Sequence, residues 1–336
     1  MAARRPALAA LALAALAPRC LSVPPLGWPT GSVRHRFFDT ARGQLHYILG
    51  GDVTASVPLV FLHSHPRSTV EFKYLVQGLN ASSAFLAVDW FGMGLSEDYN
   101  GGGAEDKFCT FEEMAGYILK ILARERVSGF VPVGSLKGSH PAIELAYQGG
   151  PSRVRKLVLL NPLILSPAAK AFIDNKLVPM LQRQALAVDG AHLIAAWNDT
   201  SAAPMGPAGA PWNNSRDLLA NQEKTGDELR CLSTGWQYDA AWTAYNEKNE
   251  PRMAAVDAYA PSLFLYGAGV LAAETKFGLD PQFSFDAFAR ALTHGHNRTH
   301  VIEGGTEGML TQNSSLIAGL IARFVGLHEP LGAIVV

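Results

Sequence analysis

Short apolar segments that alternate with helical segments constrain the fold of this 336-residue chain more than any other feature of its sequence. Val57–Leu62 (VPLVFL) and Phe85–Val88 (FLAV) are continuous apolar runs, as expected for parallel strands buried on both faces. The other predicted strands are Phe130–Val133, Val154–Leu160, Ser262–Tyr266 and Thr299–Ile302. The segments between most of these runs have helical patterns. This order predicts an α/β fold, with a doubly wound, mostly parallel sheet between helices.

The alternation is interrupted once. Residues 163–258 have helical patterns and no convincing strand pattern, and a Pro- and Gly-rich loop (MGPAGAPW) lies among them. We therefore predict an α/β core made of residues 33–162 and 259–327, with residues 163–258 inserted as a helical cap. Ligands of such sheets bind at the carboxyl ends of the strands, so the cap is expected over the site.

The N-terminus has the pattern of a targeting segment, which we place at residues 1–23. Arg4 and Arg5 precede the apolar run Ala7–Ala17, which is shorter than the roughly 20 apolar residues of a membrane-spanning helix. The run fits a secretory signal, with Ala15 and Ala17 spaced for cleavage. A transit peptide for a mitochondrion or plastid and a disordered Ala-rich terminus are the alternatives. Five N-x-S/T triplets favour the secretory route and predict a glycoprotein: Asn80, Asn198, Asn213, Asn297 and Asn313.

Charge and cysteine content exclude several classes of function. The net charge of −1 and the isoelectric point near 6.8 do not indicate a nucleic-acid partner. Cys20 lies at the edge of the targeting segment, and Cys109 and Cys231 fall in different predicted subdomains, so two buried free thiols are favoured over a disulfide. Their spacing matches no metal site, and no cofactor is expected. The oligomeric state stays open.

Several motifs follow the predicted strands. His63-Ser64-His65-Pro66 comes directly after VPLVFL, and Asp89–Ser96 (DWFGMGLS) comes after FLAV. Val133–Gly138 (VGSLKG) joins a strand to a helix. In this order and spacing they resemble the α/β-hydrolase superfamily, especially its epoxide-hydrolase and haloalkane-dehalogenase branch, over residues 33–327. The resemblance implies a hydrolase-like fold and a nucleophile–His–acid triad.

None of the three triad positions carries the residue that the resemblance implies. The nucleophile belongs at the tip of a G-x-Nuc-x-G turn, and Leu136 occupies the tip between Gly134 and Gly138. The acid is expected shortly after the strand that ends at Gly267, where the chain has Val270. The histidine position is occupied by Glu307. Ser135 is the nearest replacement nucleophile, although it precedes the tip by one residue.

The resemblance also indicates what surrounds the site. Ser64, His65 and Lys137 lie at the positions of an oxyanion hole, whose donors come from the loop after the first buried strand and from the residue after the nucleophile. Lys137 is either a cation of the pocket or a solvated lysine. The expected pocket wall consists of Trp90, Tyr238, Trp242 and Tyr245. The last three share one helix face, and packing between cap and core is the favoured explanation for them, with a ligand-binding wall as the alternative.

Three functions remain in competition. The first is a non-hydrolytic relative that binds a small apolar molecule or a partner. The second is an atypical hydrolase or lyase that uses a His65/Glu307 acid–base pair. The third is hydrolysis of a small apolar ester or epoxide through Ser135. The first is favoured, because removing a serine nucleophile lowers the turnover rate by a factor of about 10⁶.

Overall fold

Eight strands form one sheet in the order β1-β2-β4-β3-β5-β6-β7-β8. β1 and β2 form an antiparallel hairpin that pairs with β4, and the strands from β3 to β8 are parallel. Their bounds are Arg34–Thr40, Gly43–Gly50, Leu59–Leu62, Phe85–Val88, Val131–Ser135, Leu157–Leu160, Ser262–Gly267 and Arg298–Ile302. The predicted mostly parallel sheet is therefore confirmed, and the hairpin adds two strands at one edge.

The computed structural model describes residues 28, 33–79, 83–100, 108–179, 189–191, 194, 235–270, 280–306 and 308–327. Several expectations fall outside these residues. They concern the targeting segment 1–23, Cys20, Cys231, Glu307 and the triplets at Asn80, Asn198 and Asn213. Within the described part of the chain, no helix is both long and apolar enough to cross a membrane. Cys109 is buried and free.

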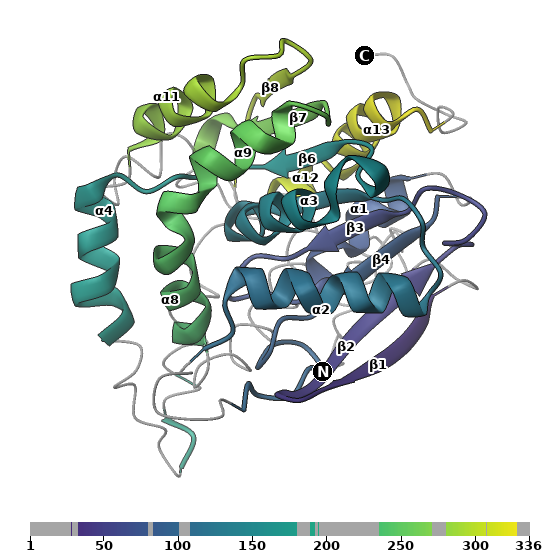
Figure 1. Cartoon of the computed structure of the whole chain (residues 1–336). Helices are drawn as coiled ribbons and strands as arrows, with labels where there is room; N and C mark the ends of the chain where they lie inside the picture. Colours follow the sequence, from purple (N-terminus) through teal and green to yellow (C-terminus); the bar gives the residue numbers. More distant parts are fainter. Residues whose placement is uncertain are drawn as a thin grey trace, which may run out of the picture.

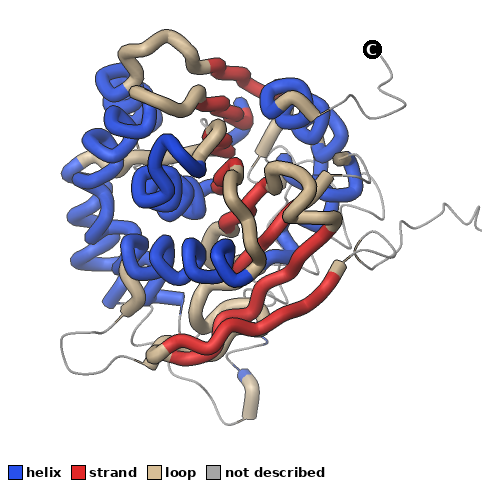
Figure 2. The backbone as a smooth tube through the Cα atoms, turned by 45° about the vertical axis from the view of Figure 1, so that its right-hand side comes forward, coloured by secondary structure: helices blue, strands red, loops and turns tan. Residues whose placement is uncertain are grey.

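Helices cover both faces of the sheet (Figures 1 and 2). Helices α2, α3, α9 and α11 pack against one another on one face, and α1, α12 and α13 pack together on the other. The bounds of these helices are Phe111–Arg124, Ser139–Arg153, Asn249–Asp257, Pro281–Ala291, Lys73–Gly78, Met309–Gln312 and Ser314–Val325. Short 3₁₀ turns precede three of them: η1 (Thr69–Phe72), η2 (Leu136–Gly138) and η4 (Asn246–Lys248).

Alternation along each strand explains the two hydrophobic layers. In β3, Val60 and Leu62 belong to one apolar cluster while Leu59 and Phe61 belong to the other. Since successive side chains of a strand point to opposite faces, a continuous apolar run is needed wherever both faces are covered. The apolar sequence of the central strands therefore follows directly from their position.

Between β6 and β7, the described residues form helices α4 (Pro167–Phe172), η3 (Ile173–Leu177) and α8 (Gly235–Tyr245), followed by η4 and α9. In Figure 1, α4 and α8 stand side by side at one end of the sheet. Helix α9 falls inside the range expected for the cap, yet it packs against α3 and α11 in the layer that covers the sheet. The cap boundaries themselves remain a prediction.

Candidate functional site

The turn that resembles a nucleophile elbow lies at the carboxyl end of β5 and leads through η2 into α3. Leu136, at its tip, has a φ of 49°, a left-handed conformation that costs a non-glycine residue about 1 to 2 kcal/mol. The flanking glycines are required by close backbone contacts. A Cβ atom on Gly134 would lie 2.4 Å from the Gly138 carbonyl oxygen, and one on Gly138 would lie 2.2 Å from that of Leu62. The tip thus keeps a strained backbone while presenting an aliphatic side chain.

The hydroxyl of Ser135 is engaged in a buried network. Its Oγ donates to Oε1 of Glu71 over 2.7 Å, and Nη1 of Arg67 donates to the same oxygen over 2.6 Å. Oε2 of Glu71 accepts from the backbone N–H of Ser64 over 2.9 Å. The side chains of Arg67 and Glu71 are 7% and 3% exposed. Because the hydroxyl of Ser135 and an N–H of Arg67 both donate to the same Glu71 oxygen, this network fixes the orientation of the Ser135 hydroxyl.

The loops that would carry the acid and the histidine lie against each other. Val270 is buried just beyond the end of β7. The backbone N–H of Gly269 donates to the Gly305 carbonyl over 2.8 Å, which joins the loop after β7 to the loop after β8. A Cβ atom on Gly267 would lie 2.6 Å from that same carbonyl oxygen. These contacts fix the two loops relative to each other at this point, with a buried apolar side chain at position 270.

A buried carboxylate of α8 lies above the elbow. Asp239 forms an ion pair with the ammonium of Lys137, and its Oδ2 lies 3.5 Å from Nδ1 of His65. Burial raises the pKa of the Asp239 carboxyl, but Lys137 and His65 outweigh burial and hold that pKa below its usual range. Burial lowers the pKa of His65, aided by Lys137 and His63, and Asp239 only partly opposes the shift. The site therefore holds an ionised carboxylate and a neutral imidazole.

The four expected pocket aromatics contact this same region. Tyr238 packs between the rings of His65 and Trp90, with centroid distances of 5.9 and 4.7 Å, and its hydroxyl donates to the His63 carbonyl over 3.0 Å. The Lys137 ammonium lies 5.0 Å from the ring centroid of Trp242. The Tyr245 hydroxyl donates to Oε2 of Glu144 over 2.9 Å. Both tyrosine hydroxyls are thus occupied by contacts between α8 and the core.

The loop after β4 is held by one carboxylate. Asp89 accepts from Nδ1 of His46 over 2.6 Å and from the backbone N–H groups of Thr69 and Leu95 over 2.7 and 3.0 Å. Nε2 of His63 accepts from the N–H of Trp90 over 2.9 Å. These bonds fix the loop after β4 against the loop after β3. The role of Asp89 is therefore structural, in agreement with its place in the motif.

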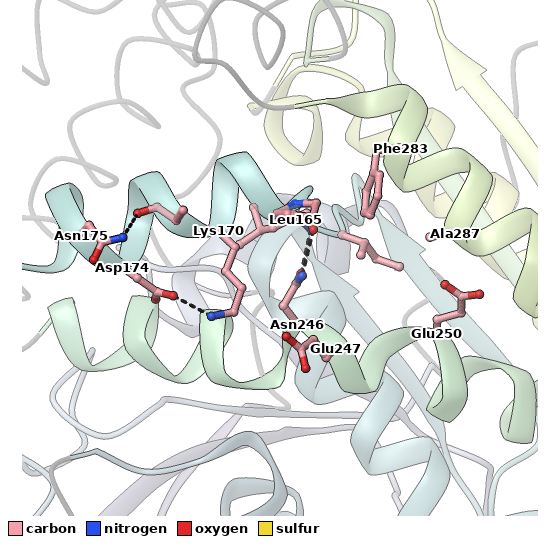
Figure 3. Close-up of a pocket in the computed structure, with 12 residues that line it drawn as sticks. Leu165, Lys170, Asp174, Asn175, Asn246, Glu247, Glu250, Phe283 and Ala287 are labelled. Atoms are coloured by element: carbon pink, nitrogen blue, oxygen red, sulfur yellow. Dashed lines mark hydrogen bonds and ion pairs between the residues drawn. The ribbon is translucent and has the colours of Figure 1, made fainter.

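A groove of about 500 Å³ lies away from the elbow, between α4, α9 and α11. Leu165, Phe283 and Ala287 contribute apolar surface to its lining. Figure 3 shows the Lys170 side chain reaching Asp174 of the same helical segment, and Asn246 reaching the Leu165 carbonyl. Since the lining includes neither Leu136 nor Lys137, the groove is distinct from the candidate site.

Within the described residues, no group of three or more His, Cys, Asp or Glu side chains is arranged to hold a metal ion. Besides Arg67 and Glu71, the sequence interpretation missed Asp239. It is the only charged residue of α8 (GWQYDAAWTAY), on a helix otherwise rich in aromatic residues. A single charge on a helix predicted to cover the site was a signal that could have identified it.

Solved structures of known proteins share the fold of this chain. The esterase RhEst1 from Rhodococcus sp. ECU1013 superimposes with a TM-score of 0.64 at 19% identity, covering 88% of this chain and 99% of that structure. The epoxide hydrolase CorEH gives 0.62 at 16% identity, with 88% and 99% covered. An esterase from Thermogutta terrifontis gives 0.66 at 16% identity, with 87% and 98% covered. This chain has the α/β-hydrolase fold.

Sequence comparison gives narrower support. Haloalkane dehalogenase 2 of Mycobacterium bovis is 26% identical over 126 residues, which are 38% of this chain and 41% of that protein. The same enzyme of Mycobacterium tuberculosis matches equally. The chain therefore matches about two fifths of the length of these curated relatives. No protein-family model matches it. The α/β-hydrolase resemblance is confirmed for the fold, with a dehalogenase among the similar sequences.

Proposed function

We propose that this α/β-hydrolase-fold protein binds a small, mainly apolar molecule above the elbow and does not hydrolyse it through a side-chain nucleophile. The observation that carries the proposal is Leu136 at the tip of the turn, in the left-handed conformation with a φ of 49°. An aliphatic side chain has no lone pair with which to attack, so a covalent intermediate cannot form there.

Two neighbouring positions support the proposal. The hydroxyl of Ser135 donates to Glu71, whose carboxylate also accepts from Arg67, and no described histidine is bonded to that hydroxyl. Val270 supplies a buried apolar side chain where the family has its acid. Leu136 leaves the elbow without a nucleophile, and Val270 leaves a catalytic histidine without the acid that would orient it.

The enclosing side chains support binding of an apolar molecule. Trp90, Phe111, Tyr238 and Trp242 are buried around the ends of β3 and β5, and such walls favour apolar and aromatic ligands. Packing between α8 and the core remains the competing role for these rings. The similar proteins include a haloalkane dehalogenase and an epoxide hydrolase, so an atypical enzyme remains the alternative function.

The test is an activity screen on simple esters, epoxides and haloalkanes with the purified full chain. We expect no turnover above background, and none after Leu136→Ser, since a serine without a base keeps its proton. Ser135→Ala is the matched variant beside it. Turnover that is lost in Ser135→Ala and survives in Leu136→Ala would refute the proposal and identify Ser135 as the nucleophile.

We also propose that the chain enters the secretory pathway, on the strength of its Arg-led apolar N-terminus and its five N-x-S/T triplets. Edman sequencing or mass spectrometry of native material should then find a mature N-terminus after residue 17 to 23. An uncleaved N-terminus would contradict this proposal.

A further inference from the structure

His65 occupies a distinctive position in the proposed binding site. It is the third residue of the loop after β3, and Tyr238 stacks against its ring at an interplanar angle of 23°. Its Nδ1 is buried without a hydrogen-bond partner among the described residues, and the nearest acceptor is Oδ2 of Asp239, 3.5 Å away. The imidazole is therefore fixed between an aromatic ring and a carboxylate.

The carboxylate determines which ring nitrogen carries the proton. A neutral imidazole has one N–H and one lone pair, and a neighbouring carboxylate selects the tautomer whose N–H faces it. Asp239 is ionised and paired with Lys137, so the proton of His65 belongs on Nδ1. The lone pair is then on Nε2. Since Nδ1 is fully buried, the 9% of the side chain that remains exposed belongs to the rest of the ring.

Aromatic rings lie beside His65, whose own ring stacks on Tyr238. Tyr238 contacts Trp90 at 4.7 Å and Phe111 at 5.4 Å between ring centroids. A ligand held there needs an apolar, preferably aromatic, body and one hydrogen-bond donor. Since the site's cation, Lys137, is already paired with Asp239, a neutral donor suits the site better than an anionic group.

We propose that Nε2 of His65, oriented by Asp239, accepts a hydrogen bond from the hydroxyl of a small aromatic alcohol or phenol bound above the elbow. The inference rests on the proposed binding function and adds the chemical class of the ligand. Asp239 is a positioning residue in this arrangement, because it sets the tautomer of His65 without touching the ligand.

The test compares two probes that differ only in the hydroxyl proton, phenol and its methyl ether anisole. Both are neutral at pH 7 and present the same ring. Calorimetric titration of the full chain should show phenol binding about 10-fold more tightly than anisole, as expected for one additional hydrogen bond. The preference should fall to about 1 in His65→Phe, while both probes still bind. His300→Phe, at an exposed histidine of β8, is the matched control and should keep the preference.

Acidic pH gives a second test that packing alone would not affect. The charged and titratable groups that face His65 are Asp239, Lys137, His63 and Tyr238. Because burial lowers the pKa of His65 below its usual 6.5, the imidazole stays neutral down to mildly acidic pH. Once it is protonated, Nε2 becomes a donor and phenol should lose its advantage over anisole.

The outcomes separate the two proposals. Equal affinity for phenol and anisole in the unmodified protein would overturn the role of His65 while leaving the binding function intact. Failure of both probes to bind would overturn the binding function itself. A preference that persists in His65→Phe would show that another group accepts the hydrogen bond, and would refute the inference.

Discussion

Replacing the ion pair between Lys137 and Asp239 should have strongly non-additive effects on stability. The Asp239 side chain is 2% exposed and that of Lys137 is 22% exposed, so each single replacement leaves a charge in a poorly hydrated place. Removing one partner of a buried pair typically costs about 3 to 5 kcal/mol. Asp239→Leu should fall near the lower figure, because the remaining lysine can still reach water. Lys137→Met should cost more, because the carboxylate it leaves behind is almost fully buried.

The double variant should recover most of the loss, since apolar residues of similar volume can replace a buried ion pair at little net cost. We expect it within about 1 kcal/mol of the unmodified protein, and at least about 3 kcal/mol more stable than the sum of the single changes implies. The assay is urea unfolding followed by tryptophan fluorescence, since Trp242 lies beside Lys137. Additive effects of the two single replacements would show that the pair is not coupled and would refute the reasoning.

Three further predictions concern the scaffold. Gly138→Ala should destabilise the fold by several kcal/mol in urea unfolding, because its Cβ would meet the Leu62 carbonyl oxygen at 2.2 Å, whereas Gly116→Ala, with open space in α2, should stabilise it by about 0.5 to 1 kcal/mol. Equal effects would contradict the steric argument. Burial raises the pKa of Asp89, but the hydrogen bond from His46, the charges of His63 and His46 and the Leu95 N–H hold it below its usual range. Its contribution to stability is thus complete above about pH 4 and is lost as the pH falls further. In an acid titration, Asp89→Asn should make the free energy of unfolding depend less on pH below about pH 4. An unchanged pH dependence would count against this role of Asp89. Glycopeptide mapping of native protein should find Asn297 unmodified, since its amide donates to Asp257 and accepts from the Ser262 N–H, and a glycan there would disprove this.

The sequence predicts the parallel part of the sheet well because burial on both faces leaves a continuous apolar run. Val57–Leu62 was predicted as one strand, and the structure has Leu59–Leu62. Thr299–Ile302 was likewise predicted as a strand, and β8 spans Arg298–Ile302. Thr110 caps α2 by accepting from the Glu113 N–H, and a Thr followed three residues later by Glu is a local signal for the start of a helix. For these elements, the local sequence pattern and burial in the core favour the same secondary structure.

The remainder depends on contacts between distant segments, which leave little local signal. Strand β1 of the hairpin is largely exposed, so its sequence (RHRFFDT) lacks an apolar run. Arg67 and Glu71 have the i, i+4 spacing of an ordinary surface pair, and only the tertiary structure buries them against Ser135. Likewise, the position of Asp239 above Lys137 depends on how α8 crosses the elbow, 102 residues away in sequence.

The backbone hydrogen bond between Gly269 and Gly305 makes this chain a useful starting point for enzyme design. Because the loops after β7 and β8 are joined through main-chain atoms, replacing their side chains need not change their separation. A designer would introduce a nucleophile at residue 136 and an acid at 270, and the backbone of the loop after β7 is already held in place. The remaining obstacle is Lys137, which directly follows the nucleophile position and is held in an ion pair with Asp239. Side chains can then be exchanged while the main-chain contact between the two loops is kept.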